Sequence, residues 1–120
     1  MSTPSATIST GLSLNGIGFD TSNTYTTSTT SQVSVDSFAT ATYRSSRYFA
    51  QMTSGSSYHI IELFLVHDGT TVYLTQYGEV FTGSSLGTFD ASITTGTLNL
   101  LFTPTNAITT VKLIRRSIVV

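Results

Sequence analysis

The dipeptide Asp68-Gly69 is the sequence feature that most constrains how this chain can fold. It lies in the middle of residues 57–82, SYHIIELFLVHDGTTVYLTQYGEVFT, where apolar residues alternate with polar ones on both sides. A two-residue type I′ turn requires positive φ at both central positions, which Asp tolerates and Gly adopts without steric cost. The segment is therefore predicted to be a β-hairpin with two long strands.

Counting outward from a two-residue turn predicts the strand register, with His67 opposite Thr70 and Leu65 opposite Val72. One face of the hairpin is apolar and is expected in a core: Ile61, Leu63, Leu65, Val72 and Leu74. The other face is only half apolar, and its candidate interface residues are Ile60, Glu62, Phe64, Tyr73 and Tyr77. Such a face is expected to be covered by another segment of the chain or by a neighbouring subunit.

A second two-residue turn is predicted at Thr95-Gly96. It would place three apolar pairs on one face: Ile93 with Leu98, Ala91 with Leu100, and Phe89 with Phe102. A four-residue loop at 104–107 would then set Val111 opposite Leu100 and extend that face into the last strand.

The remaining chain also indicates strands. One is expected from Val33 or Val35 to about residue 44 and another over 47–53, followed by a loop at 54–56. No segment shows helical periodicity with caps. The sequence therefore predicts an all-β antiparallel sandwich of about seven to nine strands over residues 36–120, with jelly-roll or immunoglobulin-like wiring.

Residues 1–35 form a Ser/Thr-rich segment that is expected to act as an extended N-terminal arm. Spaced apolar side chains would anchor it to its own domain or to a neighbour, and the candidate contacts are Leu12, Leu14, Ile17 and Phe19. One or two short strands are expected there. The first ten residues lack a basic region and an apolar core, so no secretory signal is expected. No apolar run approaches the ~20 residues of a membrane span.

Composition limits the function classes. Charged residues make up only 9% of the chain, whereas Thr and Ser number 24 and 18. A surface this poor in charge is either hydrated by hydroxyl groups or hidden in an assembly. The formal net charge of −1 gives no electrostatic case for binding nucleic acid or an anionic membrane. The absence of Cys excludes disulfides and thiol chemistry.

No catalytic, cofactor or metal site is expected. His59 and His67 are eight residues apart on one strand and cannot share a metal, and His67 is expected to face solvent beside the turn. Glu62 and Glu79 would share a face of the hairpin but lie far apart along it. Glu62 is interpreted as a charge paired with an Arg or a Tyr hydroxyl, with a subunit-interface pair as the alternative. The chain is predicted not to be an enzyme.

Arg115 and Arg116 are expected to point to opposite faces of the last strand. The simpler interpretation is a solvated or ion-paired strand end. The alternative is an electrostatic clamp on an acidic partner surface, which makes both residues candidate interface residues.

From residue 36 onward the sequence resembles a module of virion structural proteins from marine tailed phages, especially cyanophages. The resemblance rests on four blocks in this order: DSFATATYRSSRYFAQMT, ELFLVHDGTTVYLTQYGEVFTG, SLGTFDASITTGTLNLLFTP and TTVKLIRRSIVV. It implies a non-enzymatic β-sandwich located in the virion and made in the host cytoplasm. The expected role is a small, many-copy subunit that decorates or cements the capsid.

The alternative implied by the same resemblance is a tail, tail-fibre or appendage component that binds a host-surface receptor or glycan. The expected partners are major capsid or tail proteins and further copies of the chain, as in a trimer. No cofactor, nucleic acid or membrane partner is implied.

Overall fold

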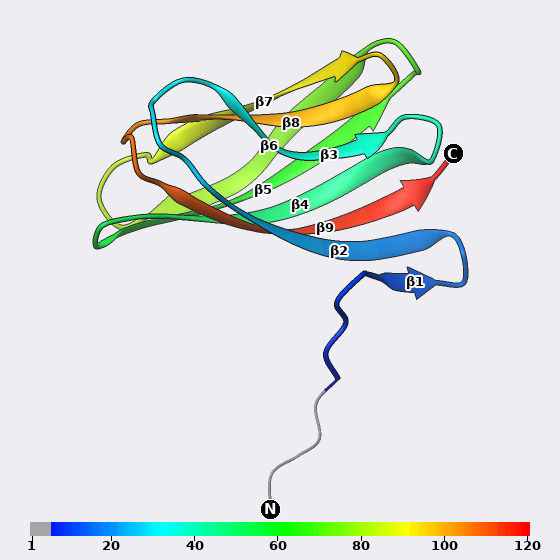
Figure 1. The fold of residues 1–120 in the computed structure, drawn as a ribbon, viewed down its shortest axis with the longest axis horizontal. Helices are drawn as coiled ribbons and strands as arrows, with labels where there is room; N and C mark the ends of the chain where they lie inside the picture. Colours follow the sequence, from blue (N-terminus) through cyan, green and yellow to red (C-terminus); the bar gives the residue numbers. More distant parts are fainter. Residues whose placement is uncertain (1–5) are drawn as a thin grey trace, which may run out of the picture.

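The computed structural model describes residues 6–120 as nine antiparallel strands in two facing sheets, which confirms the predicted all-β sandwich (Figure 1). The larger sheet has the order β1 (Leu12–Leu14), β2 (Gly18–Thr26), β9 (Thr110–Val119), β4 (Tyr43–Ser54), β5 (Ser57–His67) and β6 (Val72–Phe81). The smaller sheet has the order β3 (Val33–Ala39), β8 (Thr97–Pro104) and β7 (Gly87–Thr94). Residues 6–120 contain no helix, and hence none able to cross a membrane.

The core fills the space between the two sheets. Alternating residues of β4, β5 and β9 enter it from the larger sheet: Tyr48, Ala50, Met52, Ile61, Leu63, Leu65, Val111 and Leu113. The smaller sheet contributes Val35, Phe38, Leu98, Leu100 and Phe102, and the β6–β7 connection contributes Leu86. This one-sided burial follows from the period-2 alternation of the strands.

The β5–β6 turn differs from the prediction. The loop has four residues rather than two, so His67 pairs with Val72 and Leu65 with Leu74. The Asp68 Oδ1 atom accepts hydrogen bonds from the backbone N–H groups of Thr70 (3.0 Å) and Thr71 (2.8 Å). These bonds close a wider turn, and they lower the pKa of the Asp68 carboxyl. Side chains alternate between the two faces with a period of two, so a register shift of two residues leaves each side chain on its predicted face. Leu65, Val72 and Leu74 therefore still point towards the core.

The Thr95-Gly96 turn is confirmed. Both residues have positive φ, 48° and 75°, as a type I′ turn requires. The register of β7 and β8 is the predicted one, with Ile93 opposite Leu98 and Phe89 opposite Phe102.

The predicted pairing of the last strand with β8 is wrong, because the chain leaves the smaller sheet after Pro104 and β9 joins the larger one. Buried hydroxyl groups fix this crossing. The Thr27 Oγ1 atom donates to the carbonyl of Ala107 (2.7 Å) and accepts from the N–H of Thr109 (3.1 Å). Val111 therefore reaches the core from the sheet opposite β8.

The strand expected from residue 33 to 44 is interrupted after Ala39. Residues 40–42 form a turn in which the N–H of Thr40 donates to the carbonyl of Gly96 (3.0 Å). This turn carries the chain from β3 in the smaller sheet to β4 in the larger one. β4 consequently begins at Tyr43, four residues before the predicted start.

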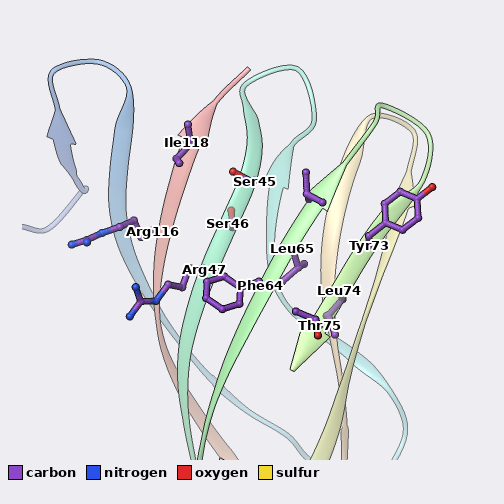
Figure 2. Close-up of a pocket in the computed structure, with 11 residues that line it drawn as sticks. Ser45, Ser46, Arg47, Phe64, Leu65, Tyr73, Leu74, Thr75, Arg116 and Ile118 are labelled. Atoms are coloured by element: carbon purple, nitrogen blue, oxygen red, sulfur yellow. The ribbon is translucent and has the colours of Figure 1, made fainter. Parts of the chain in front are cut away.

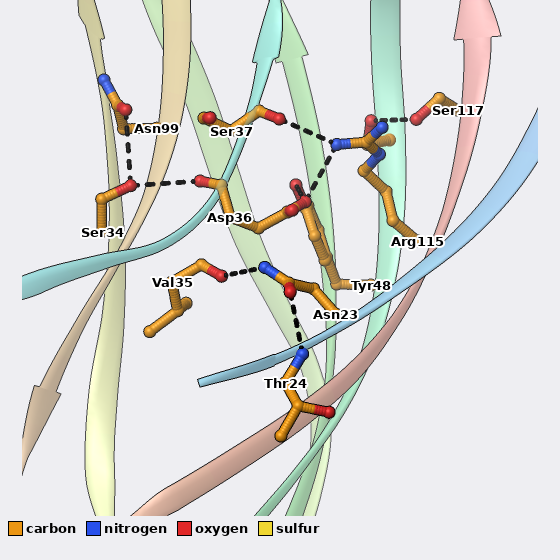
Figure 3. A network of polar contacts seen from close by, with 11 residues as sticks. Asn23, Thr24, Ser34, Val35, Asp36, Ser37, Tyr48, Asn99, Arg115 and Ser117 are labelled. Atoms are coloured by element: carbon orange, nitrogen blue, oxygen red, sulfur yellow. Dashed lines mark hydrogen bonds and ion pairs between the residues drawn. The ribbon is translucent and has the colours of Figure 1, made fainter. Parts of the chain in front are cut away.

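A buried ion pair ties the two sheets together (Figure 3). The Arg115 Nη1 atom lies 2.9 Å from the Asp36 Oδ2 atom, which also accepts the hydroxyl of Tyr48 at 2.7 Å. Burial and the Asp36 carboxylate raise the pKa of Tyr48, so this side chain remains a phenol that donates. The guanidinium also lies over the rings of Phe38 and Tyr43.

Arg115 is ion-paired, in line with the simpler interpretation. It is only 7% exposed, so the alternative of a clamp on an acidic partner does not apply to this side chain. A β-bulge between Ser34 and Asp36 is what places the Asp36 carboxylate beside it, and a sequence pattern of period 2 does not reveal such a bulge. Arg115 and Arg116 do point to opposite faces of β9, as predicted.

His67 is 3% exposed, which corrects its predicted solvent-facing position. Its Nδ1 atom accepts the N–H of Gly69 (3.0 Å), so Nε2 carries the proton and donates to the carbonyl of Tyr43. The imidazole therefore links the β5–β6 turn to the start of β4.

His59 is fully buried and has the same tautomer. Its Nδ1 atom accepts the N–H of Leu86 (3.1 Å), and its Nε2 atom donates to the Glu79 Oε2 atom (2.7 Å). A bulge between Ile61 and Leu63 turns Glu79 towards the core-facing side. Glu62 and Glu79 thus lie on opposite faces of the sheet, contrary to the prediction.

The N-terminal segment adds strands to the larger sheet. β2 pairs with β9 along its whole length, from Gly18 opposite Ile118 to Thr26 opposite Thr110, and β1 pairs with β2 at the sheet edge. The predicted arm boundary after residue 35 falls within β3. The first five residues of the predicted arm lie outside the described residues.

Candidate functional site

The outer face of the larger sheet is the side of β2, β9, β4, β5 and β6 that points away from the core. It carries a large number of exposed apolar side chains for a surface without a partner. Those on the four strands from β9 to β6 are Phe49, Tyr58, Ile60, Phe64, Val66, Tyr73, Val80, Ile114 and Ile118. Contiguous exposed apolar surface of this kind is typical of a binding face.

Two arginines interrupt this apolar surface at its centre. Arg116 on β9 and Arg47 on β4 are directly paired residues, so their side chains leave the same face side by side. Arg116 makes a two-bond ion pair with Asp20 on β2, at 2.9 and 3.0 Å, and Arg47 pairs with Glu62 on β5 at 3.2 Å. The result is a row of charges that runs carboxylate, guanidinium, guanidinium, carboxylate across the sheet.

Two hollows adjoin the arginines. The larger has a volume of about 510 Å³, and its lining includes Arg47, Arg116, Phe64, Tyr73 and Ile118 (Figure 2). The smaller has a volume of about 170 Å³ and is lined by Asp20, Arg47, Phe49, Ile114 and Arg116. The larger hollow has the size and the mainly apolar lining of small-ligand sites, with a few polar groups at one side.

The structure brings six of the predicted interface residues to one region: Arg116 and the five from the β5–β6 hairpin. Ile60, Glu62, Phe64 and Tyr73 lie on the outer face, and the Tyr77 ring packs at 5.8 Å from the Phe64 ring. Tyr73 and Tyr77 are 58% and 66% exposed. The predicted ion pairing of Glu62 with an arginine is present.

The predicted arm contacts lie elsewhere. Leu12, Leu14 and Ile17 are exposed at the β1 edge, which is the edge opposite to β6. Phe19 is half-buried, with its ring 5.6 Å from that of Tyr43. These residues are thus not part of the surface around the two arginines.

Sequence reasoning missed Arg47, Asp20 and Ile118 as members of the site. Arg47 and Arg116 become neighbours only through the pairing of β4 with β9, which joins distant parts of the chain. The alternation of polar and apolar residues in each strand was the available signal, but it does not identify the partner strand.

The arrangement favours binding over catalysis. Asp20 and Glu62 are separated by three strand spacings, about 14 Å, whereas a glycosidase carboxylate pair lies within about 5–9.5 Å. Within residues 6–120, no three His, Asp or Glu side chains are grouped as metal ligands.

The ion pair of Asp20 is expected to make stability depend on pH. The hydrogen bonds from Arg116 lower the pKa of the Asp20 carboxyl below its ordinary value of 3.8. The pair therefore stabilises the fold above that pH, and its contribution is lost as the pH falls through the lowered folded-state value. Asp20→Asn should lower the melting temperature slightly at pH 7, by an amount equivalent to less than about 1 kcal/mol. Thermal denaturation from pH 7 to pH 2 should show the two proteins converging in acid, whereas a constant difference would contradict this role.

No protein-family model matches the sequence, and no curated protein matches it significantly. Three solved structures with similar folds are tailspike proteins of Acinetobacter phages. The tailspike of Acinetobacter baumannii bacteriophage Fri1, a capsular polysaccharide depolymerase, matches 90% of this chain with 17% identity and a TM-score of 0.51. The tailspikes of Acinetobacter phage vB_ApiP_P1 and of A. baumannii phage AM24 match 95% and 84% of the chain, with identities of 18% and 10% and TM-scores of 0.44 and 0.45.

The chain spans about a fifth to a quarter of these tailspikes, with 19%, 24% and 26% of their lengths covered. At such sequence identities a structural likeness shows the fold alone. Of these three tailspikes, the one from Fri1 has a TM-score above 0.5, the level at which a shared fold can be stated. The β-sandwich of this chain thus shares its fold with one segment of a phage tailspike.

Proposed function

We propose that this chain is a non-enzymatic module of a tailed-phage tail appendage that binds a bacterial surface polysaccharide through the outer face of its larger sheet. The observation that carries the proposal is the hollow of about 510 Å³ on that face, whose lining combines the exposed rings of Phe64 and Tyr73 with two arginines. A sugar ring presents both apolar C–H groups and hydroxyl groups, and this combination of side chains is suited to both.

Two further observations support a role in a tail appendage. The fold recurs within the Fri1 tailspike, and the sequence blocks from residue 36 onward resemble virion proteins of tailed phages. The neighbouring tailspikes come from Acinetobacter phages, so the narrower relation to marine cyanophages stays a prediction. The comparisons lend no support to a role in capsid decoration, which also stays a prediction.

A second candidate function is self-association into an oligomer such as a trimer. It is favoured by Ile60, Tyr73, Tyr77 and Val80, which are exposed on the outer face or along β6, the edge strand whose second side pairs with no strand of residues 6–120. A ten-residue edge strand with apolar side chains is a ready surface for a second copy. In that arrangement the outer face would be covered in the assembled particle.

The polysaccharide proposal is tested with the double variant Phe64→Ala/Tyr73→Ala. Both side chains are exposed, so the variant should fold normally, which circular dichroism checks. Affinity for the polysaccharide that the unmodified protein binds best, chosen from immobilised bacterial capsular and exopolysaccharides, should fall about tenfold or more. Ile108→Ala removes an exposed apolar side chain outside the outer face and should leave affinity unchanged.

Two outcomes would contradict the proposal. One is the absence of binding to every polysaccharide, and the other is binding that the double variant does not weaken. If the double variant instead converts an oligomer into monomers in sedimentation velocity, with no polysaccharide bound by either protein, self-association replaces polysaccharide binding as the function of this face.

A further inference from the structure

We infer that the small hollow lined by Arg47 and Arg116 receives a carboxylate group, so that the ligand is an acidic saccharide such as a uronic acid polymer. This inference rests on the proposed function and narrows its ligand class.

The two guanidiniums keep most of their donors free for a ligand. Arg116 uses Nε and Nη2 in its pair with Asp20, and Arg47 uses only Nη2 in its pair with Glu62. No other hydrogen bond from either side chain occurs in the part of the chain that the structure describes. A guanidinium has five N–H donors, so at least one nitrogen of each side chain remains unused. Both side chains are more than half exposed, at 58% and 52%.

The two guanidiniums leave the same face side by side, and among residues 6–120 no carboxylate is bonded to both of them. Like charges on directly paired residues of a sheet repel each other. Arg116 and Arg47 lie on the neighbouring strands β9 and β4. Their carboxylate partners lie on the two flanking strands, Asp20 on β2 and Glu62 on β5. Both arginines line the hollow, with Asp20 already bonded to Arg116 at its side, so a ligand carboxylate there would accept hydrogen bonds from their unused N–H groups. Its planar pair of oxygens matches the fork geometry of a guanidinium.

The surface next to the guanidiniums suits the rest of a sugar residue. Both arginines also line the larger hollow, together with the rings of Phe64 and Tyr73 and the side chain of Ile118 (Figure 2). A pyranose ring stacked on Phe64, the residue paired with Arg47, would turn its carboxylate towards the arginines, and further sugar residues of the polymer would extend over the hollow towards Tyr73. A polyanion without such rings would gain only the electrostatic part of this interaction.

The test uses the full chain and a defined set of polymers. The set contains neutral and acidic bacterial capsular and exopolysaccharides, each acidic polymer also with its carboxylates chemically reduced to alcohols, and dextran sulfate as a general polyanion. We expect binding to at least one acidic polymer, and a roughly ten- to hundredfold loss of affinity when its carboxylates are reduced.

Two variants distinguish the arginines from general positive charge. Arg47→Gln/Arg116→Gln should lose affinity for the acidic polymer roughly as much as carboxyl reduction does. Arg47→Lys/Arg116→Lys keeps both charges and should still lose most of it, because Lys lacks the planar fork. Lys112→Gln removes a cation from the same face of β9 and should change affinity less than about twofold.

The outcomes separate this inference from the proposed function. Binding to neutral polymers, or equal binding before and after carboxyl reduction, would overturn the inference and leave the polysaccharide-binding function in place. A second contradicting result is that dextran sulfate binds as tightly as the acidic polymer and that Lys112→Gln weakens binding as much as the arginine variants do. Binding would then be general charge attraction, and the inference would be overturned. Binding to no polymer at all would overturn both.

Discussion

Asp36→Asn should lower the free energy of unfolding by about 3–5 kcal/mol. The substitution leaves the Arg115 charge in the interior, where its side chain is 8% exposed and the Asp36 carboxylate is its ion-pair partner (Figure 3). It also weakens the hydrogen bond that Tyr48 donates to Asp36. Because β3 and β9 belong to different sheets, the loss acts on the contact between the two layers. Urea denaturation followed by circular dichroism measures the effect.

Two controls accompany this measurement. Asp90→Asn removes an exposed carboxylate on β7 and should change stability by less than about 0.5 kcal/mol. Asp36→Asn/Arg115→Met removes both charges and should recover part of the loss, since an apolar side chain does not require the missing partner. If Asp36→Asn is no more destabilising than Asp90→Asn, the buried ion pair does not hold the sheets together.

Gly87→Ala should destabilise the fold by about 3 kcal/mol. A Cβ atom at this position would lie 2.4 Å from the Phe102 Cε1 atom and 2.6 Å from the carbonyl oxygen of Thr103. Phe102 is fully buried at the centre of the core and cannot move without displacing its neighbours. The residue also has φ +155°, which L side chains rarely adopt.

Gly83→Ala is the matched control, because Gly83 lies four residues before Gly87, in the β6–β7 connection, and no heavy atom beyond its chain neighbours lies within 4 Å of the added Cβ. It should be neutral or slightly stabilising. Thermal and urea denaturation of the two variants should differ clearly. A Gly87→Ala protein as stable as Gly83→Ala would mean that β7 does not pack on Phe102 as described.

Local signals in the sequence predicted the parts of the fold that depend on neighbouring residues. The Thr95-Gly96 turn and the β7–β8 register depend on two adjacent residues with positive φ and on alternation around them. The prediction of a two-residue turn at Asp68-Gly69 was wrong, although it also rested on two adjacent residues. There the Asp side chain accepts backbone hydrogen bonds and closes a four-residue loop, which competes with the two-residue turn.

The crossings between sheets could not be predicted in the same way. Alternation placed Val111 on a buried face correctly, but it does not say which sheet that face belongs to. The assignment of β9 to the larger sheet depends on contacts such as the buried Thr27 hydroxyl at the crossing. Bulges also limit what alternation can predict, because each one changes the face to which single residues point. The bulges in β3 and between β5 and β6 turn Asp36 and Glu79 to faces that strict alternation does not predict.

The candidate site was predicted in part for the same reason. The hairpin pattern identified Ile60, Phe64 and Tyr73 as an exposed, half-apolar face, and the structure places them there. The pair of arginines at its centre arises from the long-range pairing of β4 with β9. Arg115 was interpreted as part of a solvated or ion-paired strand end, but the sequence did not identify its partner, the Asp36 carboxylate on the opposite sheet.

The most direct test of polysaccharide binding by the outer face is an NMR titration of the ¹⁵N-labelled chain with an oligosaccharide cut from the polysaccharide that it binds best. Chemical-shift changes are expected to concentrate in β9, β4 and β5 around Arg116, Arg47 and Phe64, with the smaller sheet unchanged. Changes confined to β3, β8 and β7 or to the loops, or no changes at saturating oligosaccharide, would contradict the account.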